Sequence, residues 1–167
     1  MRGRVDREQP DDGQATDAAF MAFDKAYKAY IGPDAPHHGA YLTYNGHPMI
    51  FIFPKHGRVD WNRVAEHCRG WEATPYLIYK DDPPPQSAAA IAGSYAWVQP
   101  GQKGWTPDGS DWGEGYLDYF YKTMRNKHPD KIAVGAAWPG FDDSAAKWGL
   151  NRHMANRCGQ TFEDTLH

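Results

Sequence analysis

Long apolar runs are missing from this sequence of 167 residues. No stretch approaches the roughly 20 consecutive apolar residues of a membrane-spanning helix, and the polar N-terminal residues do not look like a signal peptide. An excess of either charge is missing too, because 18 Lys and Arg against 21 Asp and Glu give a net charge of −3. We therefore expect neither a nucleic-acid partner nor a membrane partner.

Several catalytic and cofactor motifs are also absent. The sequence has no GxxxxGK[ST] loop, no GxGxxG after a strand, no GxSxG elbow and no HExxH helix, which argues against nucleotide binding, serine hydrolysis and zinc-protease chemistry. Cys68 and Cys158 form no CxxC pair and indicate no redox compartment. His37 and His38 are adjacent but lack partners at ligand spacing, so a solvated loop is expected there. We expect no metal and no cofactor.

Aromatic residues, in contrast, are abundant. They make up 14% of the chain, with seven Trp and ten Tyr. Both side chains combine a flat apolar face with a polar edge, which suits contact with sugar rings or peptides. Large aromatics also fill ordinary cores, so composition alone leaves both interpretations open.

Apolar runs alternate with segments of helical periodicity after a polar, frayed segment at 1–15. One domain is therefore expected over 16–167. Four buried strands are predicted at 48–54, 74–79, 93–98 and 131–138. Helices are predicted from about residue 16, after Asp60, from a capping box formed by Asp111 and Glu114, and from Thr161. This alternation predicts an α/β fold of parallel strands, a partial TIM (β/α)8 barrel cut before its last strands.

Polar or aromatic side chains follow each predicted strand. Because reactive groups of parallel barrels sit where strands end, these side chains are expected to share one rim. Carboxylates beside indoles are what glycoside hydrolysis uses, as acids and as flat surfaces for sugars. The alternative is that strand-end polar groups only cap the next helices. The predicted rim residues are Lys55, Asp81, Trp97, Gln99, Trp138 and Asp143.

The segment KIAVGAAWPGFDD, residues 131–143, carries the strongest of these patterns. A short apolar run leads into Trp138, a Pro-Gly turn and two adjacent carboxylates, Asp142 and Asp143. Both are candidate catalytic acids, with Asp143 preferred, because neighbouring residues on extended chain point apart. One of the two is expected to cap the next segment. A core strand followed by a turn and a capping acid would give the same pattern.

Together with PMIFIFPKHGRVDW, TPYLIYKDD and GSYAWVQPGQ, this segment resembles the glycoside hydrolase family 71 and family 99-like proteins, over roughly residues 43–166. Those families are (β/α)8 barrels that include endo-α-mannosidases and α-1,3-glucanases. The resemblance implies an oligosaccharide or polysaccharide partner. It adds Phe141, from the Pro139-Gly140-Phe141-x-Asp143 pattern, and Arg157, from Arg-x-Gly-x-x-Phe, to the predicted substrate-binding residues.

The sequence departs from that resemblance in one respect. In the endo-mannosidase-like members the catalytic glutamates lie on a strand after the helix that corresponds to Thr161. The last residue of this sequence is His167, so the resemblance implies that the family's acids would lie beyond His167. The expectation is a fragment of an enzyme for α-linked glycans that is itself inactive. The alternatives are a non-catalytic glycan-binding module and a protein of polysaccharide assembly.

Overall fold

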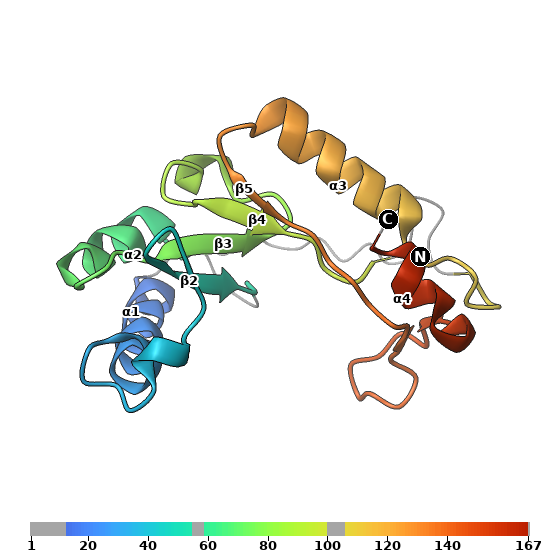
Figure 1. The fold of residues 1–167 in the computed structure, drawn as a ribbon, viewed down its shortest axis with the longest axis horizontal. Coiled ribbons are helices and arrows are strands. Elements are labelled where there is room, and N and C mark those ends of the chain that lie inside the picture. The colour runs from blue at the N-terminus through green and yellow to red at the C-terminus, as the bar shows by residue number, and fades with distance from the viewer. Residues whose placement is uncertain (1–12, 55–58, 100–105, 167) are drawn as a thin grey trace. The chain divides into compact units, whose positions relative to one another are not determined.

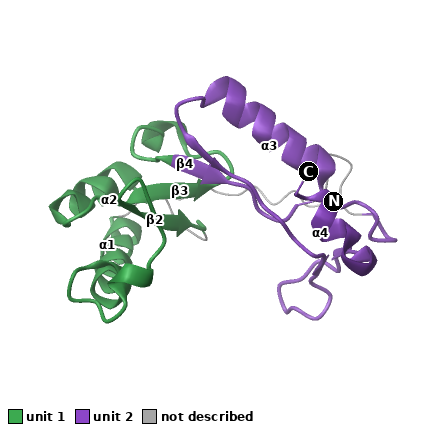
Figure 2. Ribbon diagram, in the orientation of Figure 1, with its two compact units in different colours: residues 1–92 green, residues 93–167 purple. Residues whose placement is uncertain are grey.

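The structure is a computed structural model that describes residues 13–54, 59–99 and 106–166. The chain divides into two compact units, residues 1–92 and 93–167 (Figure 2). The predicted frayed segment at 1–15 lies almost entirely outside the described residues. The first element that the structure describes is α1 (Gln14–Ala26), which continues as a π-helical turn over Tyr27–Ile31.

His167, the last residue of the predicted domain, also lies outside the described residues. The expectation that the family's catalytic acids would lie beyond His167 is therefore not tested by the structure and stays a prediction. The described part of the second unit ends at Leu166, whose amide donates to the Glu163 carbonyl at 3.0 Å.

Two parallel strands organise the first unit (Figure 1). β2 (His47–Ile52) pairs with β3 (Tyr76–Lys80), with Met49 opposite Tyr76 and Ile52 opposite Tyr79. A short strand, β1 (Thr43–Tyr44), pairs antiparallel with β2. The two residues that join them, Asn45 and Gly46, have φ of 51° and 80°. This is the left-handed conformation that a tight hairpin turn requires and that Asn-Gly adopts readily.

The helices of the first unit pack against one face of these strands. α2 (Trp61–His67) begins at Asp60, whose carboxylate accepts hydrogen bonds from the Asn62 and Arg63 amides, as the sequence predicts. The Asp60 amide in turn donates to the Thr16 hydroxyl of α1 at 3.0 Å. Alternate strand positions supply the core between strands and helices. Its buried members are Phe23, Ile52, Trp61, Val64, Cys68, Leu77, Tyr79 and Ile91.

A second parallel pair lies in the second unit. β4 (Gly93–Tyr95) pairs with β5 (Ile132–Val134), and α3 (Glu114–Lys127) connects them along the chain. The two backbones approach so closely that a Cβ on Gly93 would lie 2.3 Å from the Ile132 carbonyl oxygen. Glycine at position 93 is therefore a packing requirement. The core of this unit consists of Ala96, Tyr116, Leu117, Phe120, Met124, Trp138 and Met154.

After β5 the second unit becomes irregular. It contains a two-stranded ribbon of β6 (Phe141–Asp142) and β7 (His153–Met154), followed by α4 (Gln160–Asp164). Single 3-10 turns complete the described structure. They are η2 (His38–Ala40), η3 (Cys68–Gly70), η4 (Pro85–Ser87) and η5 (Arg157–Gly159).

Several sequence predictions need correction at element boundaries. β2 ends at Ile52 and not at 54, and β4 ends at Tyr95 and not at 98. β5 ends at Val134 and not at 138, because its partner strand β4 ends at Tyr95, which lies opposite Val134. A Cβ on the next residue, Gly135, would lie 2.0 Å from the Tyr121 hydroxyl of α3. The capping box is wrong: Gly113 is the N-cap of α3, and Asp111 instead accepts the Gly113 amide at 2.9 Å. The last helix begins at Gln160 after Gly159, so Thr161 is not its cap.

The structure is a mixed α/β arrangement rich in parallel strands, consistent with part of a TIM barrel. Among the described residues no helix combines the length and the hydropathy that a membrane span needs.

Candidate functional site

The β6–β7 ribbon carries Asp142, one of the two predicted candidate acids. Its antiparallel register places Phe141 opposite Met154 and Asp142 opposite His153. Gly140, with φ of 149°, leads into the ribbon, and a Cβ there would lie 2.9 Å from the Met154 carbonyl oxygen. The Pro-Gly pair seen in the sequence therefore makes a close backbone crossing that aims Phe141 and Asp142 along the ribbon.

Asp142 is exposed, and its carboxylate accepts a hydrogen bond from the Ser144 amide at 2.8 Å. The Ser144 backbone and side chain lower the pKa of Asp142, and the nearby His153 adds a smaller effect in the same direction. The side chain is therefore a carboxylate at neutral pH. It can accept hydrogen bonds from hydroxyl groups of a bound molecule.

Asp143 points the other way and is only 2% exposed. Its Oδ1 accepts from the Arg152 amide and its Oδ2 from Arg152 Nε, both at 2.6 Å. Burial by itself raises the pKa of Asp143, but the hydrogen bonds from the Arg152 amide and side chain, and from Leu150, outweigh that effect and lower it. Asp143 is a buried anion whose bonds hold the chain together.

The two tryptophans of the predicted rim differ in exposure. Trp138 is only 6% exposed; its indole Nε1 donates to the Trp112 carbonyl at 2.9 Å and its amide to the Thr165 hydroxyl at 3.3 Å. Trp97 is 42% exposed, and its amide donates to the Tyr116 hydroxyl at 2.9 Å. Trp138 is thus bonded to the segment before α3 and to the residue after α4, whereas Trp97 presents part of its surface to solvent.

The remaining predicted rim residues are Gln99, Asp81 and Lys55, and their placement on one common rim stays a prediction. Gln99 is exposed in the second unit, where its carbonyl packs against Gly113. Asp81, in the first unit, has φ of 55° and lies 3.8 Å from Lys80 Nζ. Lys55 lies outside the described residues.

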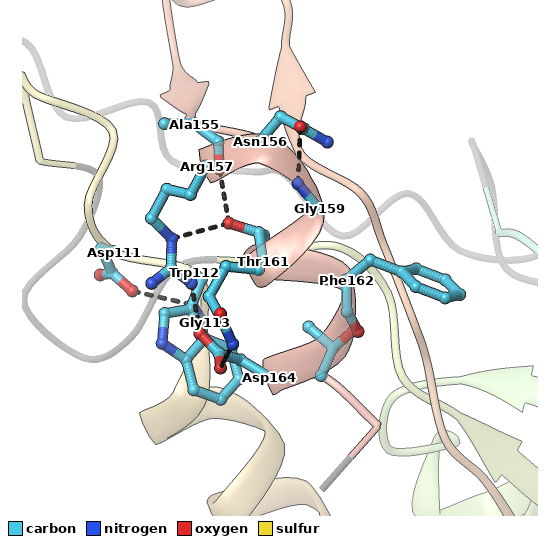
Figure 3. Close-up of polar contacts among 12 residues, drawn as sticks. Asp111, Trp112, Gly113, Ala155, Asn156, Arg157, Gly159, Thr161, Phe162 and Asp164 are labelled. Carbon is cyan, nitrogen blue, oxygen red and sulfur yellow. Dashed lines mark hydrogen bonds and ion pairs between the residues drawn. The ribbon is translucent and has the colours of Figure 1, made fainter.

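Arg157 is part of a network that closes the start of α4 (Figure 3). Its Nε donates to the Thr161 hydroxyl at 2.9 Å, and its guanidinium contacts the Asp164 carboxylate at 2.5 Å. The Thr161 hydroxyl donates to the Ala155 carbonyl at 2.6 Å, and the Gly159 amide donates to the Asn156 side chain at 2.9 Å. Three consecutive left-handed residues, Arg157, Cys158 and Gly159, make the turn that this network fixes.

Two open hollows adjoin the ribbon, and both are lined by Asp142 and His153. The smaller, about 330 Å³, also contacts Phe141 and Asn156. The larger, about 750 Å³, also contacts Thr106, Ser144, Leu150 and Arg152. The loop carrying Thr106 is held in place because the Ala155 amide donates to the Gly109 carbonyl at 2.8 Å. Hydroxyl, carboxylate, imidazole and aromatic groups therefore line the two hollows beside the ribbon.

His153 and the Thr106 loop were not among the residues that the sequence predicted. His153 comes ten residues after the acid segment, and only the register of the ribbon brings it opposite Asp142. A histidine facing a loop of Thr, Asp and Ser carries no spacing motif that would reveal it. Among the described residues no cluster of three or more His, Cys, Asp or Glu side chains could hold a metal ion.

Comparisons with known proteins give one informative likeness. The sequence matches no protein-family profile and no curated protein. The fold is similar to that of the GH99 endo-α-mannosidase from Bacteroides thetaiotaomicron, solved in complex with BIS-TRIS-propane, with a TM-score of 0.55 and 13% sequence identity. The match covers 91% of this chain and 47% of the other, so the chain spans about half the length of the enzyme it resembles. At this identity the likeness describes the fold.

Proposed function

We propose that this chain is part of a barrel protein that acts on α-linked glycans, and that its second unit binds the glycan at the β6–β7 ribbon. The fold likeness to an endo-α-mannosidase supports the choice of ligand class. The observation that carries the site is the cross-strand pair of Asp142 and His153, which lines both hollows of the ribbon.

The groups around the ribbon match the chemistry of a sugar. A sugar ring has hydroxyl groups at its edge and C–H groups on its faces, so it needs hydrogen-bonding partners beside an apolar surface. The Asp142 carboxylate accepts hydrogen bonds from hydroxyls, and the His153 ring can donate or accept according to its tautomer. Phe141 supplies an aromatic side chain, with the Arg152 guanidinium 5.6 Å from its ring centre.

The chain on its own is proposed to bind without cleaving. Glycoside hydrolysis commonly uses two carboxyl groups that flank the scissile bond, about 5 to 9.5 Å apart. Asp143 is buried and engaged with Arg152, which leaves Asp142 as the single exposed carboxylate on the ribbon. This favours a binding role for these residues. Hydrolysis of α-linked glycans by the barrel protein as a whole rests on the fold likeness alone.

Calorimetric titration of the 167-residue chain with α-mannan and α-1,3-glucan oligosaccharides tests the proposal. We expect binding to at least one of them, no release of reducing ends, and weaker binding for Asp142→Asn and His153→Ala. Asp118→Asn serves as the control, because Asp118 is exposed and pairs with Lys122 on α3. Absence of binding to both oligosaccharides would contradict the glycan assignment, and hydrolysis lost in Asp143→Asn would make that residue catalytic.

A further inference from the structure

The loop of residues 144–151, between β6 and β7, is closed at its base by one side chain. The Asp143 carboxylate binds the Arg152 amide and Nε, while the Asp143 amide donates to the Arg152 carbonyl at 3.2 Å. The Asp142 carboxylate binds the Ser144 amide at the start of the loop. Both ends of the loop are therefore fixed to the ribbon that carries the proposed glycan site.

The interior of the loop is also ordered by its own backbone. The Ala146 amide donates to the Asp143 carbonyl at 3.0 Å, and the Gly149 amide donates to the Ala146 carbonyl at 2.9 Å. Gly149 packs so tightly that a Cβ would lie 1.8 Å from the Asp143 carbonyl oxygen. Two consecutive turns and this close approach give the loop a single compact shape.

This fixed loop exposes two large apolar side chains. Trp148 is 69% exposed and Leu150 is 74% exposed. Trp138, ten residues earlier in the chain, lies in the core instead. A rigid aromatic at a surface loses little conformational entropy when a ligand covers it, so it is an effective binding group.

The loop also forms one side of the larger hollow. Ser144 and Leu150, which flank Trp148 in sequence, line the hollow together with Asp142 and His153. Thr106, which also lines the hollow, belongs to a loop whose polar groups bind one another: Thr106 Oγ1 accepts the Asp111 amide at 3.0 Å. Trp148 stands two residues before Leu150, which lines the hollow. An indole suits the apolar faces of a ligand whose edges carry hydroxyl groups.

We infer that Trp148 is a stacking platform for a second sugar unit of a glycan whose first unit contacts Asp142 and His153. The inference rests on the proposed glycan-binding function and adds to it a preference for oligosaccharides over single sugars. Trp148 acts by covering the face of one ring. The bonds between Asp143 and Arg152 fix the base of the 144–151 loop that carries this indole.

The test compares mannose, which is a single sugar unit, with a longer α-mannan oligosaccharide, both titrated into the full chain. Trp148→Ala is expected to leave the binding of mannose unchanged. We expect Trp148→Ala to weaken binding of the longer oligosaccharide by about tenfold, which is the size of one aromatic contact. Trp148→Tyr keeps a flat ring, so it is expected to lose less affinity for the longer oligosaccharide than Trp148→Ala does. Tyr30→Ala is the matched control, since Tyr30 is an exposed aromatic of the first unit.

The outcomes separate this inference from the proposed function. If Asp142→Asn weakens binding while Trp148→Ala binds the longer oligosaccharide as tightly as the unaltered chain, the inference is overturned and the function stands. If the unaltered chain binds neither ligand, both fail. If Tyr30→Ala weakened binding of the longer oligosaccharide as much as Trp148→Ala, the inference would also be overturned, because the loss of affinity would then not depend on the 144–151 loop. Circular dichroism of each variant verifies that the fold is retained.

Discussion

Arg152 binds both carboxylate oxygens of Asp143, one through its backbone amide and the other through its side chain, each at 2.6 Å. The two residues are nine positions apart in the chain. The buried carboxylate therefore adds two charge-assisted hydrogen bonds at the base of the loop, beside the backbone bond from the Asp143 amide to the Arg152 carbonyl.

Removing the charge of Asp143 is expected to loosen the 144–151 loop. Asp143→Asn keeps the size of the side chain but replaces one carboxylate oxygen by an amide nitrogen that cannot accept from Arg152. Amide hydrogen exchange of residues 144–151 is expected to accelerate about tenfold, with a lower Tm. Asp142→Asn is the control, because its exposed side chain binds the Ser144 amide by a bond that an amide oxygen can replace. Equal acceleration in both variants would contradict the closure by Asp143.

Acidification of the unaltered chain should also loosen the 144–151 loop and lower the Tm. The folded-state pKa of Asp143 lies below the ordinary value of 3.8, since the bonds from Arg152 outweigh burial. A depressed carboxyl pKa contributes stability that is present above 3.8 and is lost as the pH falls through the folded-state pKa. The Tm difference between the unaltered chain and Asp143→Asn should therefore narrow below 3.8. A Tm difference that stays constant in acid would show that the ionised carboxylate of Asp143 is not the stabilising form.

Gly113→Ala is expected to destabilise the second unit by about 2–4 kcal/mol. Gly113 has φ of 87°, and a Cβ there would lie 2.2 Å from the Gln99 carbonyl oxygen and 3.0 Å from the Trp138 ring. Gly13→Ala is a matched control: its φ is 79° and nothing lies within 4 Å. Only the left-handed strain of about 1 kcal/mol applies to it. Urea denaturation of both variants measures the difference, and equal losses would refute the close contact.

The two cysteines are expected to differ in reactivity. Burial, with a smaller contribution from Asp24, raises the pKa of Cys68 to about 12, whereas Cys158 is exposed. Since the thiolate is the reacting form, a thiol reagent should modify one cysteine rapidly in the native chain and both after denaturation. Cys158→Ser should abolish the fast reaction, and Cys68→Ser should leave it unchanged. Rapid modification of Cys158→Ser would contradict the burial of Cys68.

The parallel strand pairs and the cap of α2 were predictable because their signals are local. β2 and β3 are short apolar runs within a βαβ pattern, and Asp60 immediately precedes the helix that it caps. The start of α3 was mispredicted because Asp111 and Glu114 have the spacing of a capping box, while Gly113 takes the left-handed conformation between them. Sequence spacing does not reveal backbone conformation at a glycine.

The arrangement of the candidate site was less predictable because it depends on long-range pairing. The sequence indicated that Asp142 and Asp143 point apart, and the structure places one at the surface and the other beside Arg152. Nothing local distinguishes which of the two is buried. The pairing of Asp142 with His153 depends on the register of a two-residue ribbon. The exposure of Trp148 depends on a loop closed by a residue outside it.

Because the bonds between Asp143 and Arg152 fix the two ends of the 144–151 loop, changes within the loop are expected to cost little folding stability. A segment whose two ends are fixed side by side can be lengthened or replaced with only a small loss of loop entropy. Substitutions at Lys147, Trp148 and Leu150, which are all exposed, leave the core of the second unit intact. Under the proposed glycan-binding function, exchange of this one short segment would change the ligand preference while the core of the second unit stays the same.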